Sequence, residues 1–521
     1  MVRGVADRRF GGPRGERLGG NPLMHDRGKS DDLVVPAKPL NKPAVAGAEV
    51  VEGRGSAEGN TAGETRPGRS AGSGVSSELV RVRQMARKDR QVRFTALLHH
   101  VTVDRLRAAY WALEPRAAPG VDGVTWRDYG LDLEANLADL HARVQRGAYR
   151  AMPSRRVFIP KPDGRLRPLG VAALEDKVLQ RAVVEVLNAI YEVDFLGFSY
   201  GFRPGRSQHD ALDALAAGIL RKKVTVVLDA DVRDFFTSLD HSWLLKFLEH
   251  RIADTRVLRL IQKWLRAGVI EDGEWSSSEE GTPQGASVST LLANVYLHYV
   301  FDLWVHQWRS RHARGDVIAV RFADDFVVGF EHRDDAERFW ADLRERFAEF
   351  NLELAEEKTR LIEFGRFAAR NRAYRGESKP ETFEFLGFTH VCAITKQGRF
   401  KLERLTSKKK MRAKLKSVKT ELMRRRHLPI PEQGRWLASV LRGHYGYYAV
   451  PDNSRALRGF RQRVIRHWRR ALSRRSQKRP MTWKRTDLYA ARWLPQPRIL
   501  HPRPDTRFDA RIKTQGGSPV S

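Results

Sequence analysis

Three aspartates at the ends of apolar segments constrain this chain more than any other feature. Asp324 and Asp325 lie at the expected tip of a hairpin, VIAVRFADDFVVGF, and Asp231 follows another apolar segment, VTVVLDAD. Both segments have the density of β-branched and aromatic residues that is typical of strands, so the acids lie where the strands stop. Such carboxylates can hold two Mg²⁺ ions about 3.5–4 Å apart, an arrangement for in-line displacement at phosphorus. The alternative is an ordinary hairpin turn, in which aspartate is common.

Other segments carry groups that suit a nucleoside triphosphate. IPKPDGRLRPLG places Lys161 and Arg167 on either side of a Pro-Asp-Gly turn, so a hairpin would direct both cations the same way. A solvated basic loop is the alternative. In GTPQGAS, glycines such as Gly285 let backbone approach a ligand closely, and Gln284 supplies an amide. Phe236 lies five residues after the first aspartate, within reach of the sugar of a bound nucleotide.

Taken in order, these segments resemble the reverse transcriptases of bacterial group II introns. The resemblance also includes SYGFRPGRSQHDAL, LELAEEKTRLIEFG and FEFLGFTH, and it extends into VLRGHYGYYAVPDN, which is similar to the maturase segment of that family. It covers about residues 78 to 505. It implies an α+β fold, a right-hand polymerase with fingers, palm and thumb, followed by an all-α basic maturase extension.

The resemblance also implies a role for each candidate residue. It assigns Asp231, Asp324 and Asp325 to catalysis and to two Mg²⁺ ions, for which Mn²⁺ can substitute. The remaining expected roles are the incoming triphosphate for Lys161 and Arg167, exclusion of a ribose 2′-hydroxyl for Phe236, the nucleotide and template pocket for Gln284 and Gly285, and substrate contact for Arg203 and Lys358. For Lys358 a solvated surface lysine is the alternative.

Composition limits the possible partners. Ninety-four Lys and Arg against 62 Asp and Glu leave a net charge of +32, which indicates a polyanionic partner. No apolar run approaches the roughly 18 residues of a membrane-spanning helix, and the N-terminus has no signal-peptide core, so we expect a cytoplasmic protein without membrane contact. The single cysteine, Cys392, excludes internal disulfides and thiolate metal clusters.

The sequence divides into five expected regions. The first 77 residues contain 15 Gly and 6 Pro and only one aromatic residue, a composition that favours disorder. The other expected boundaries are fingers and palm over 78–390, thumb over 391–430, maturase domain over 431–505 and a tail over 506–521.

The charge is concentrated towards the C-terminus. Residues 401–480 contain 25 basic and 4 acidic residues, and the helical patterns within this segment predict basic faces for binding phosphate. Aromatic and arginine planes can stack on unpaired RNA bases, so this segment also supplies candidate RNA-binding residues: Arg442, His444, Tyr445, Tyr447 and Tyr448. Core packing is the alternative for at least one of the tyrosines.

The expected function is RNA-directed DNA synthesis together with binding of intron RNA to assist splicing and retrohoming. The expected partners are group II intron RNA, a DNA target and deoxynucleoside triphosphates. The single cysteine also predicts that the DNA endonuclease domain found in some relatives is lacking. Two alternatives stay open: a related reverse transcriptase of a diversity-generating or CRISPR-linked system, and a non-catalytic RNA-binding splicing factor.

Overall fold

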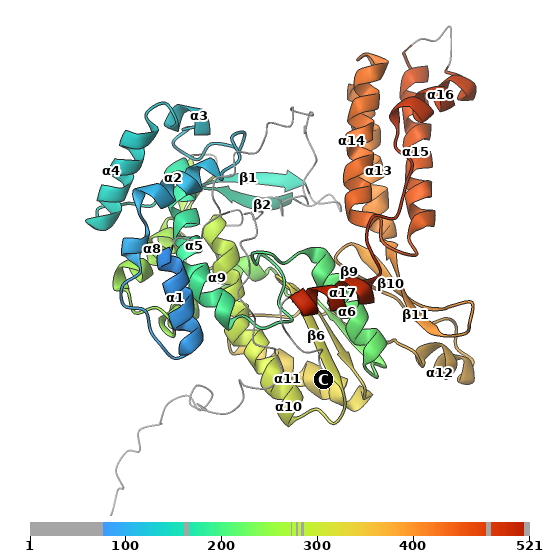
Figure 1. Ribbon diagram of the computed structural model, residues 1–521, viewed down its shortest axis with the longest axis horizontal. Helices are drawn as coiled ribbons and strands as arrows, with labels where there is room; N and C mark the ends of the chain where they lie inside the picture. The colour runs from blue at the N-terminus through green and yellow to red at the C-terminus, as the bar shows by residue number, and fades with distance from the viewer. Residues whose placement is uncertain are drawn as a thin grey trace, which may run out of the picture.

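The computed structural model describes residues 77–160, 166–271, 273–277, 280–282, 286–475 and 481–514. The segment expected to be disordered therefore lies outside the described residues, apart from its last residue. The described chain combines many helices with three separate β-sheets, as the α+β expectation requires (Figure 1). None of its helices is both long enough and apolar enough to cross a bilayer.

A four-stranded antiparallel sheet, called here the central sheet, has the strand order β6-β7-β3-β8. Alternate residues of β3 enter different apolar clusters: Val226 and Leu228 face one cluster, and Val227 faces the other. Because both faces are buried, the strands read as nearly continuous apolar runs. Their bounds are Val226–Ala230 for β3, Val317–Phe322 for β6, Asp325–Phe330 for β7 and Arg360–Glu363 for β8.

Helices cover both faces of the central sheet. One face packs with α11, and α6 lies against β6 on the other face. The helices of this region are α5 (Leu174–Asp194), α6 (Gln208–Arg221), α9 (Ser287–Leu297), a π-helix (His298–Asp302), α10 (Leu303–Arg311), α11 (Arg333–Ala348) and α12 (Ala368–Tyr374).

A second sheet, with the order β2-β1-β4-β5, stands beside the N-terminal helices (Figure 1). The hairpin expected around Pro-Asp-Gly is confirmed, because β1 and β2 pair antiparallel up to Pro160 opposite Leu166. The strands are β1 (Ser154–Pro160), β2 (Leu166–Val171), β4 (Val269–Glu271) and β5 (Glu274–Ser276), and the neighbouring helices are α1 (Ser77–Lys88), α2 (Val103–Trp111), α3 (Trp126–Tyr129), α4 (Leu133–Gln145), α7 (His241–Glu249) and α8 (Thr255–Arg266).

The third sheet and a helical bundle follow in the chain. The sheet contains β9 (Phe383–Phe385), β10 (Phe388–Ile394) and β11 (Phe400–Thr406), and its apolar residues join those of the central sheet. The boundary expected at residue 390 falls inside β10. The helices that follow, called here the basic bundle, have their own core and comprise α13 (Lys408–Arg424), α14 (Ile430–Tyr448), α15 (Ser454–Ser473) and α16 (Trp483–Trp493).

The C-terminal segment leaves the basic bundle and returns to the central sheet. Residues 494–503 have no helix or strand, and α17 (Pro504–Thr514) then packs on α6 (Figure 1). Asp213 of α6 is buried and forms ion pairs with Arg507 of α17 and Arg404 of β11. The region expected to be a tail from residue 506 is thus part of a packed helix over its described length.

Candidate active site

The hairpin that carries Asp324 and Asp325 has the expected form. Phe322 pairs with Asp325, so Ala323 and Asp324 are the two residues of the turn between β6 and β7. Ala323 has a φ of +58°, in the left-handed region that residues with a side chain rarely adopt. Such a backbone is retained only where its surroundings enforce it, and it occurs often at functional sites.

Asp231 lies at the same edge of the central sheet as this turn. Ala230 pairs with Phe326, so the next residue along β3 comes level with Asp325 at the start of β7. Asp229 precedes Asp231 by two residues, so its side chain points to the same side of the sheet as that of Asp231. Burial, together with the charges of Asp325 and Asp231, raises the pKa of Asp229 to about 6 against the opposing effect of Arg360. The strand ends thus concentrate negative charge.

Two cations, Lys358 and Arg360, lie at this edge. The ammonium of Lys358 forms an ion pair with Asp231, which places the side chain at the candidate active site as expected from the sequence. Arg360, two residues later, lies 3.6 Å from Asp229. Our sequence reasoning missed Asp229 and Arg360, although the period-two spacing of Asp229 and Asp231 on one strand face was a visible signal.

The donor chemistry of this edge suits Mg²⁺, which prefers carboxylate oxygens as protein ligands. In the described part of the chain, however, no three acidic, histidine or cysteine side chains converge closely enough to form a ready metal site. Strand register brings the backbones of Asp231, Asp324 and Asp325 to one edge of the sheet, and the ammonium group of Lys358 pairs with the carboxylate of Asp231.

Phe236 lies beside another predicted site segment. It belongs to a short 3-10 helix, Phe235–Thr237, and its ring is partly buried. Its carbonyl accepts a 2.8 Å hydrogen bond from the backbone N–H of Thr282, and a Cβ on Gly281 would lie only 2.8 Å from the same oxygen. The start of GTPQGAS therefore packs directly against the candidate sugar gate.

The structure does not describe the side-chain contacts of three predicted substrate residues, or the position of Gly285. Lys161, Gln284 and Gly285 lie outside the described residues. Arg167 is placed only through its backbone, which pairs with Ile159 in the β1–β2 hairpin.

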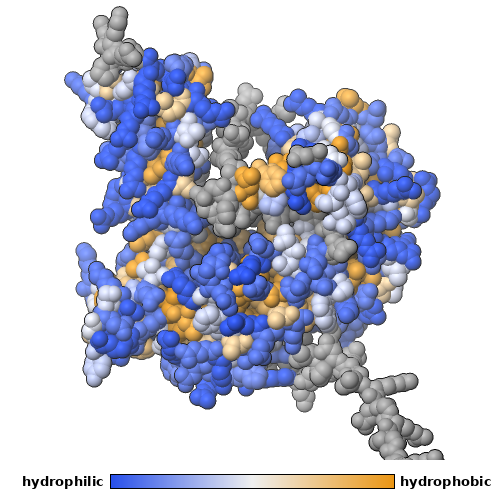
Figure 2. Space-filling model, turned by 180° about the vertical axis from the view of Figure 1, so that it is seen from behind, coloured by the Kyte–Doolittle hydropathy of each residue, from blue (hydrophilic) through white to orange (hydrophobic). Residues whose placement is uncertain are grey.

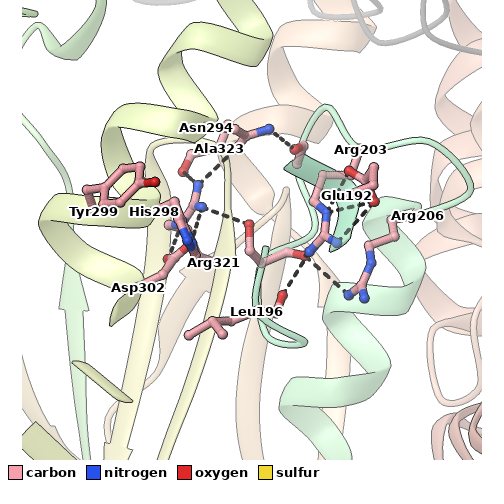
Figure 3. Close-up of polar contacts among 12 residues, drawn as sticks. Glu192, Leu196, Arg203, Arg206, Asn294, His298, Tyr299, Asp302, Arg321 and Ala323 are labelled. Carbon is pink, nitrogen blue, oxygen red and sulfur yellow. Dashed lines mark hydrogen bonds and ion pairs between the residues drawn. The ribbon is translucent and has the colours of Figure 1, made fainter. Parts of the chain in front are cut away.

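Arg203 is a correction to the sequence-based assignment. Its side chain is enclosed, its guanidinium binds both carboxylate oxygens of Glu192, and it donates hydrogen bonds to the carbonyls of Leu196 and Ser199 (Figure 3). A cation enclosed and paired in this way serves the local fold, so we withdraw its assignment to substrate contact. Arg206 contributes to the same loop by donating to the carbonyl of Ser199.

The aromatic segment expected to stack on RNA is also largely structural. His444 and Tyr445 are only 6% and 4% exposed, and the His444 ring stacks on Phe460 with centroids 3.7 Å apart. Tyr447 donates a 2.6 Å hydrogen bond to the carbonyl of Leu386, joining the basic bundle to the β9–β11 sheet. Packing against apolar neighbours explains these aromatic residues, so we withdraw His444 and Tyr445 as RNA contacts.

The other two members of the segment differ from each other. Tyr448 is partly buried, and its ring packs with those of Phe388 and His444. Arg442 is exposed on α14, so its assignment to RNA stays a prediction.

Replacement of His444 by Phe should weaken the dependence of stability on pH. Burial, followed by the charge of Lys414, lowers the pKa of His444 to about 3, whereas an unfolded histidine titrates near 6.5. Its contribution to folding is complete above pH 6.5 and is lost as the pH falls towards 3. From pH 7.5 to 5.5, the wild type should therefore lose about 1 kcal/mol of unfolding free energy that His444→Phe retains.

Urea unfolding at the two pH values measures this difference, and RNA affinity at pH 7.5 should be unchanged. His427→Phe, at an exposed position of the same bundle, is the matched His→Phe substitution measured beside it. Weaker RNA binding by His444→Phe, with an unaltered pH dependence of unfolding, would restore the stacking hypothesis.

The basic bundle presents cations along two of its packed helices. α13 and α15 contact each other, and the hydrophilic surface of the bundle is at the upper left of Figure 2. Exposed cations recur at helical spacing along one side of each helix, as Lys409, Arg412, Lys416 and Lys419 on α13 and as Arg455, Arg458, Arg466 and Arg470 on α15. Stripes of this kind match the repeated charge of a nucleic acid backbone.

Comparison with known proteins identifies the central part of the chain. Residues 159–390 match the family described as reverse transcriptase (RNA-dependent DNA polymerase). Protein YkfC of Escherichia coli is 34% identical over 276 residues, which cover 47% of this chain and 72% of YkfC. The group II intron-encoded protein LtrA of Lactococcus lactis is 35% identical over 182 residues, 35% of this chain but only 30% of LtrA.

A fungal protein shows the same partial coverage. A 91 kDa protein of Schizosaccharomyces pombe, described as lying in the cob intron, is 41% identical over 158 residues. This match covers 30% of the present chain and 19% of the fungal protein.

Proposed function

Because this chain belongs to the reverse transcriptase family of RNA-dependent DNA polymerases, we propose that it copies RNA into DNA with Asp231, Asp324 and Asp325 as the catalytic carboxylates. The observation that carries this assignment is the strand register, which brings all three to one edge of the central sheet. We assign the sugar of the nucleotide to Phe236, whose carbonyl accepts a hydrogen bond from the backbone N–H of Thr282.

The chemistry follows from these positions. Two Mg²⁺ ions, when bound, lower the pKa of the attacking 3′-hydroxyl and neutralise charge on the triphosphate. Asp231 and Asp324 would hold them from adjacent strand ends, with Asp325 at the edge of the same site. Lys358 neutralises Asp231 in this structure. Since its side chain is 53% exposed, it can turn towards an incoming triphosphate, which supports the predicted substrate role.

Primer extension tests this activity directly. Purified protein supplied with an RNA template, a DNA primer, deoxynucleoside triphosphates and Mg²⁺ should synthesise complementary DNA. Absence of synthesis with either Mg²⁺ or Mn²⁺, by protein that binds the template and primer, would favour the non-catalytic splicing-factor alternative.

The finer proposal is a reverse transcriptase encoded by a group II intron, with a maturase activity. Its support is the similarity to LtrA, a group II intron-encoded protein. In Figure 1 the basic bundle stands on one side and the N-terminal helices on the other, as thumb and fingers would. We assign α13 to the thumb and α14–α16 to the maturase region.

The intron RNA is the partner that this proposal requires. Sequencing the RNA that co-purifies with the protein should return one structured intron RNA in large excess over other transcripts. Recovery of RNA from a diversity-generating or CRISPR-linked locus would instead support the alternative reverse transcriptase class.

Replacement of Phe236 should relax sugar selection. A ring packed against the deoxyribose leaves no space for a 2′-hydroxyl, so Phe236→Ala should incorporate ribonucleotides while it continues to use deoxynucleotides. Exclusion of a small group by shape alone is worth about 1–3 kcal/mol, so discrimination should fall roughly 10- to 200-fold. Single-nucleotide incorporation kinetics with matched deoxy- and ribonucleotides measure this ratio.

The neighbouring Phe235 is the matched control for this change. Its ring is buried in the core, so Phe235→Leu should alter stability while discrimination is retained. If Phe236→Ala selects deoxynucleotides as well as the parent does, another residue is the gate.

A further inference from the structure

Arg321 is a fully buried cation only three residues before Asp324. It lies on β6 with 0% of its surface exposed, among apolar neighbours of the central sheet. A buried charge is costly unless it is paired and its hydrogen-bonding groups are satisfied. The contacts of this side chain therefore indicate what it does for the fold.

Every N–H of the Arg321 guanidinium donates to an acceptor (Figure 3). Nε and Nη2 donate to the two carboxylate oxygens of Asp302 at 2.7 and 2.6 Å, and Nη2 also donates to Ser199 Oγ at 2.7 Å. Nη1 donates to Asn294 Oδ1 and to the carbonyl oxygen of Ala323, both at 3.0 Å. The last of these acceptors belongs to the turn residue next to Asp324.

The side-chain partners of Arg321 come from two separate parts of the chain. Asn294 is on α9, Asp302 ends the π-helix that follows it, and Ser199 lies in the segment after α5. Backbone bonds reinforce the last connection, because Arg321 N–H donates to the carbonyl of Phe198. The guanidinium therefore fixes the β6–β7 turn relative to its surroundings.

The turn itself is packed closely on its other side. A Cβ on Gly201 would lie 2.1 Å from the backbone nitrogen of Ala323, so only glycine fits there. Asn294 holds this glycine in place through a 2.8 Å hydrogen bond from Nδ2 to its carbonyl. Asn294 thus contacts both Arg321 and the segment that presses on Ala323.

We propose that Arg321 is a positioning residue that holds Ala323 in its left-handed conformation and so directs the Asp324 carboxylate to the catalytic edge. The inference rests on the proposed role of Asp324. Loss of the bond to the Ala323 carbonyl allows the turn to relax to a commoner backbone conformation, which moves Asp324. Lysine cannot replace arginine in this role, because an ammonium group lacks the planar fork that reaches Asp302, Asn294 and Ala323 together.

The first experiment compares Arg321→Lys with the wild type in primer extension at varied Mg²⁺ concentration. We expect kcat to fall about 100-fold, the effect that a displacement near 1 Å can have on a reacting group. The Mg²⁺ concentration for half-maximal activity should rise several-fold, while template-primer affinity stays the same. A purely structural role would lower stability without changing the Mg²⁺ requirement.

Arg251→Lys is the matched control for loss of a buried arginine. Arg251 is 2% exposed, pairs with Asp194 at 3.0 Å and donates to the carbonyls of Ala86, Asp89 and Val92, away from the turn. This variant should be less stable but should keep the wild-type Mg²⁺ requirement. If both lysine variants show the same requirement as the wild type, the positioning role is refuted.

Glycine at the turn provides a second, independent readout. Glycine adopts a φ of +58° without strain. Ala323→Gly alone should therefore change kcat little. Combined with Arg321→Lys, it should restore part of the kcat that the lysine variant loses. Absence of any rescue would contradict the proposed link through the turn. An inactive wild type would instead refute the proposed function and is therefore distinguishable.

If Arg321→Lys does not fold, Asn294→Ala provides the alternative test of the positioning role. This variant removes one acceptor of the guanidinium and the support of Gly201, but it leaves the ion pair with Asp302 intact. A raised Mg²⁺ requirement in Asn294→Ala supports the positioning role, and a wild-type requirement contradicts it.

Discussion

Asp324→Ala should abolish RNA-templated DNA synthesis while the protein keeps its fold. Asp324 occupies the β6–β7 turn at the edge where Asp231 follows β3, so under the proposed function its removal would leave a metal ion with too few ligands. Loss of one group that stabilises charge in a transition state typically lowers the rate about 100-fold or more. Single-turnover primer extension with saturating template and nucleotide measures this loss.

Asp334→Ala is the control for this variant. Asp334 also belongs to an Asp-Asp pair, but it is exposed in the first turn of α11. Its replacement should leave synthesis near the wild-type rate. Near-wild-type extension by Asp324→Ala would remove this carboxylate from the catalytic assignment and would make the ordinary-turn interpretation correct.

Removal of arginines from α15 should weaken RNA binding without abolishing synthesis on a short template at high concentration. Arg458, Arg466 and Arg470 are exposed along one side of this helix. Each phosphate contact releases counterions, so their joint replacement by Gln should reduce the slope of log affinity against log salt by about 2–3. Titration of intron RNA at several salt concentrations gives this slope.

Three arginines on α11 provide a control with the same change in charge. Arg333, Arg338 and Arg344 are exposed and form ion pairs with acidic neighbours. Their replacement by Gln should leave the salt slope within error of the wild type. An equal effect of both triple variants would mean that net charge, and not the α15 surface, governs RNA affinity.

The two activities should be separable through these variants. Asp324→Ala should bind and splice intron RNA as the parent does, because the acid is far in sequence from the basic bundle and is not part of it. Loss of splicing by this variant, with RNA affinity intact, would argue against separate activities. Truncation near residue 400 would test separation less cleanly than this point variant, because it removes β11 and leaves β10 paired only with β9.

The sequence correctly predicted those parts of the site that depend on local pattern. The apolar runs around Asp324 and Asp231 have strand periodicity and end in acids, and the structure has strands that end there. The hairpin around Pro-Asp-Gly follows from turn chemistry in the same way. Both predictions rely on contacts between residues close in the chain, which short sequence windows contain.

The errors arose where long-range packing decides the role of a side chain. The aromatic residues of α14 have the composition of a base-stacking surface, but Phe460 and the β9–β11 sheet cover much of them. Arg203 lies in a glycine-rich turn that would suit a ligand, yet Glu192 and two carbonyls enclose it. Composition cannot distinguish a covered aromatic or cationic group from an exposed one.

The sequence by itself determined the three acids, their position at strand ends and the concentration of positive charge in residues 401–480. Only the tertiary structure decided that Arg321, a cation within an apolar strand, is paired with Asp302 and reaches Ser199, 122 residues away in the chain. It also decided that the C-terminal helix α17 returns to pack on α6. Such pairings form because a buried charge must find its partner in space, wherever the chain supplies one.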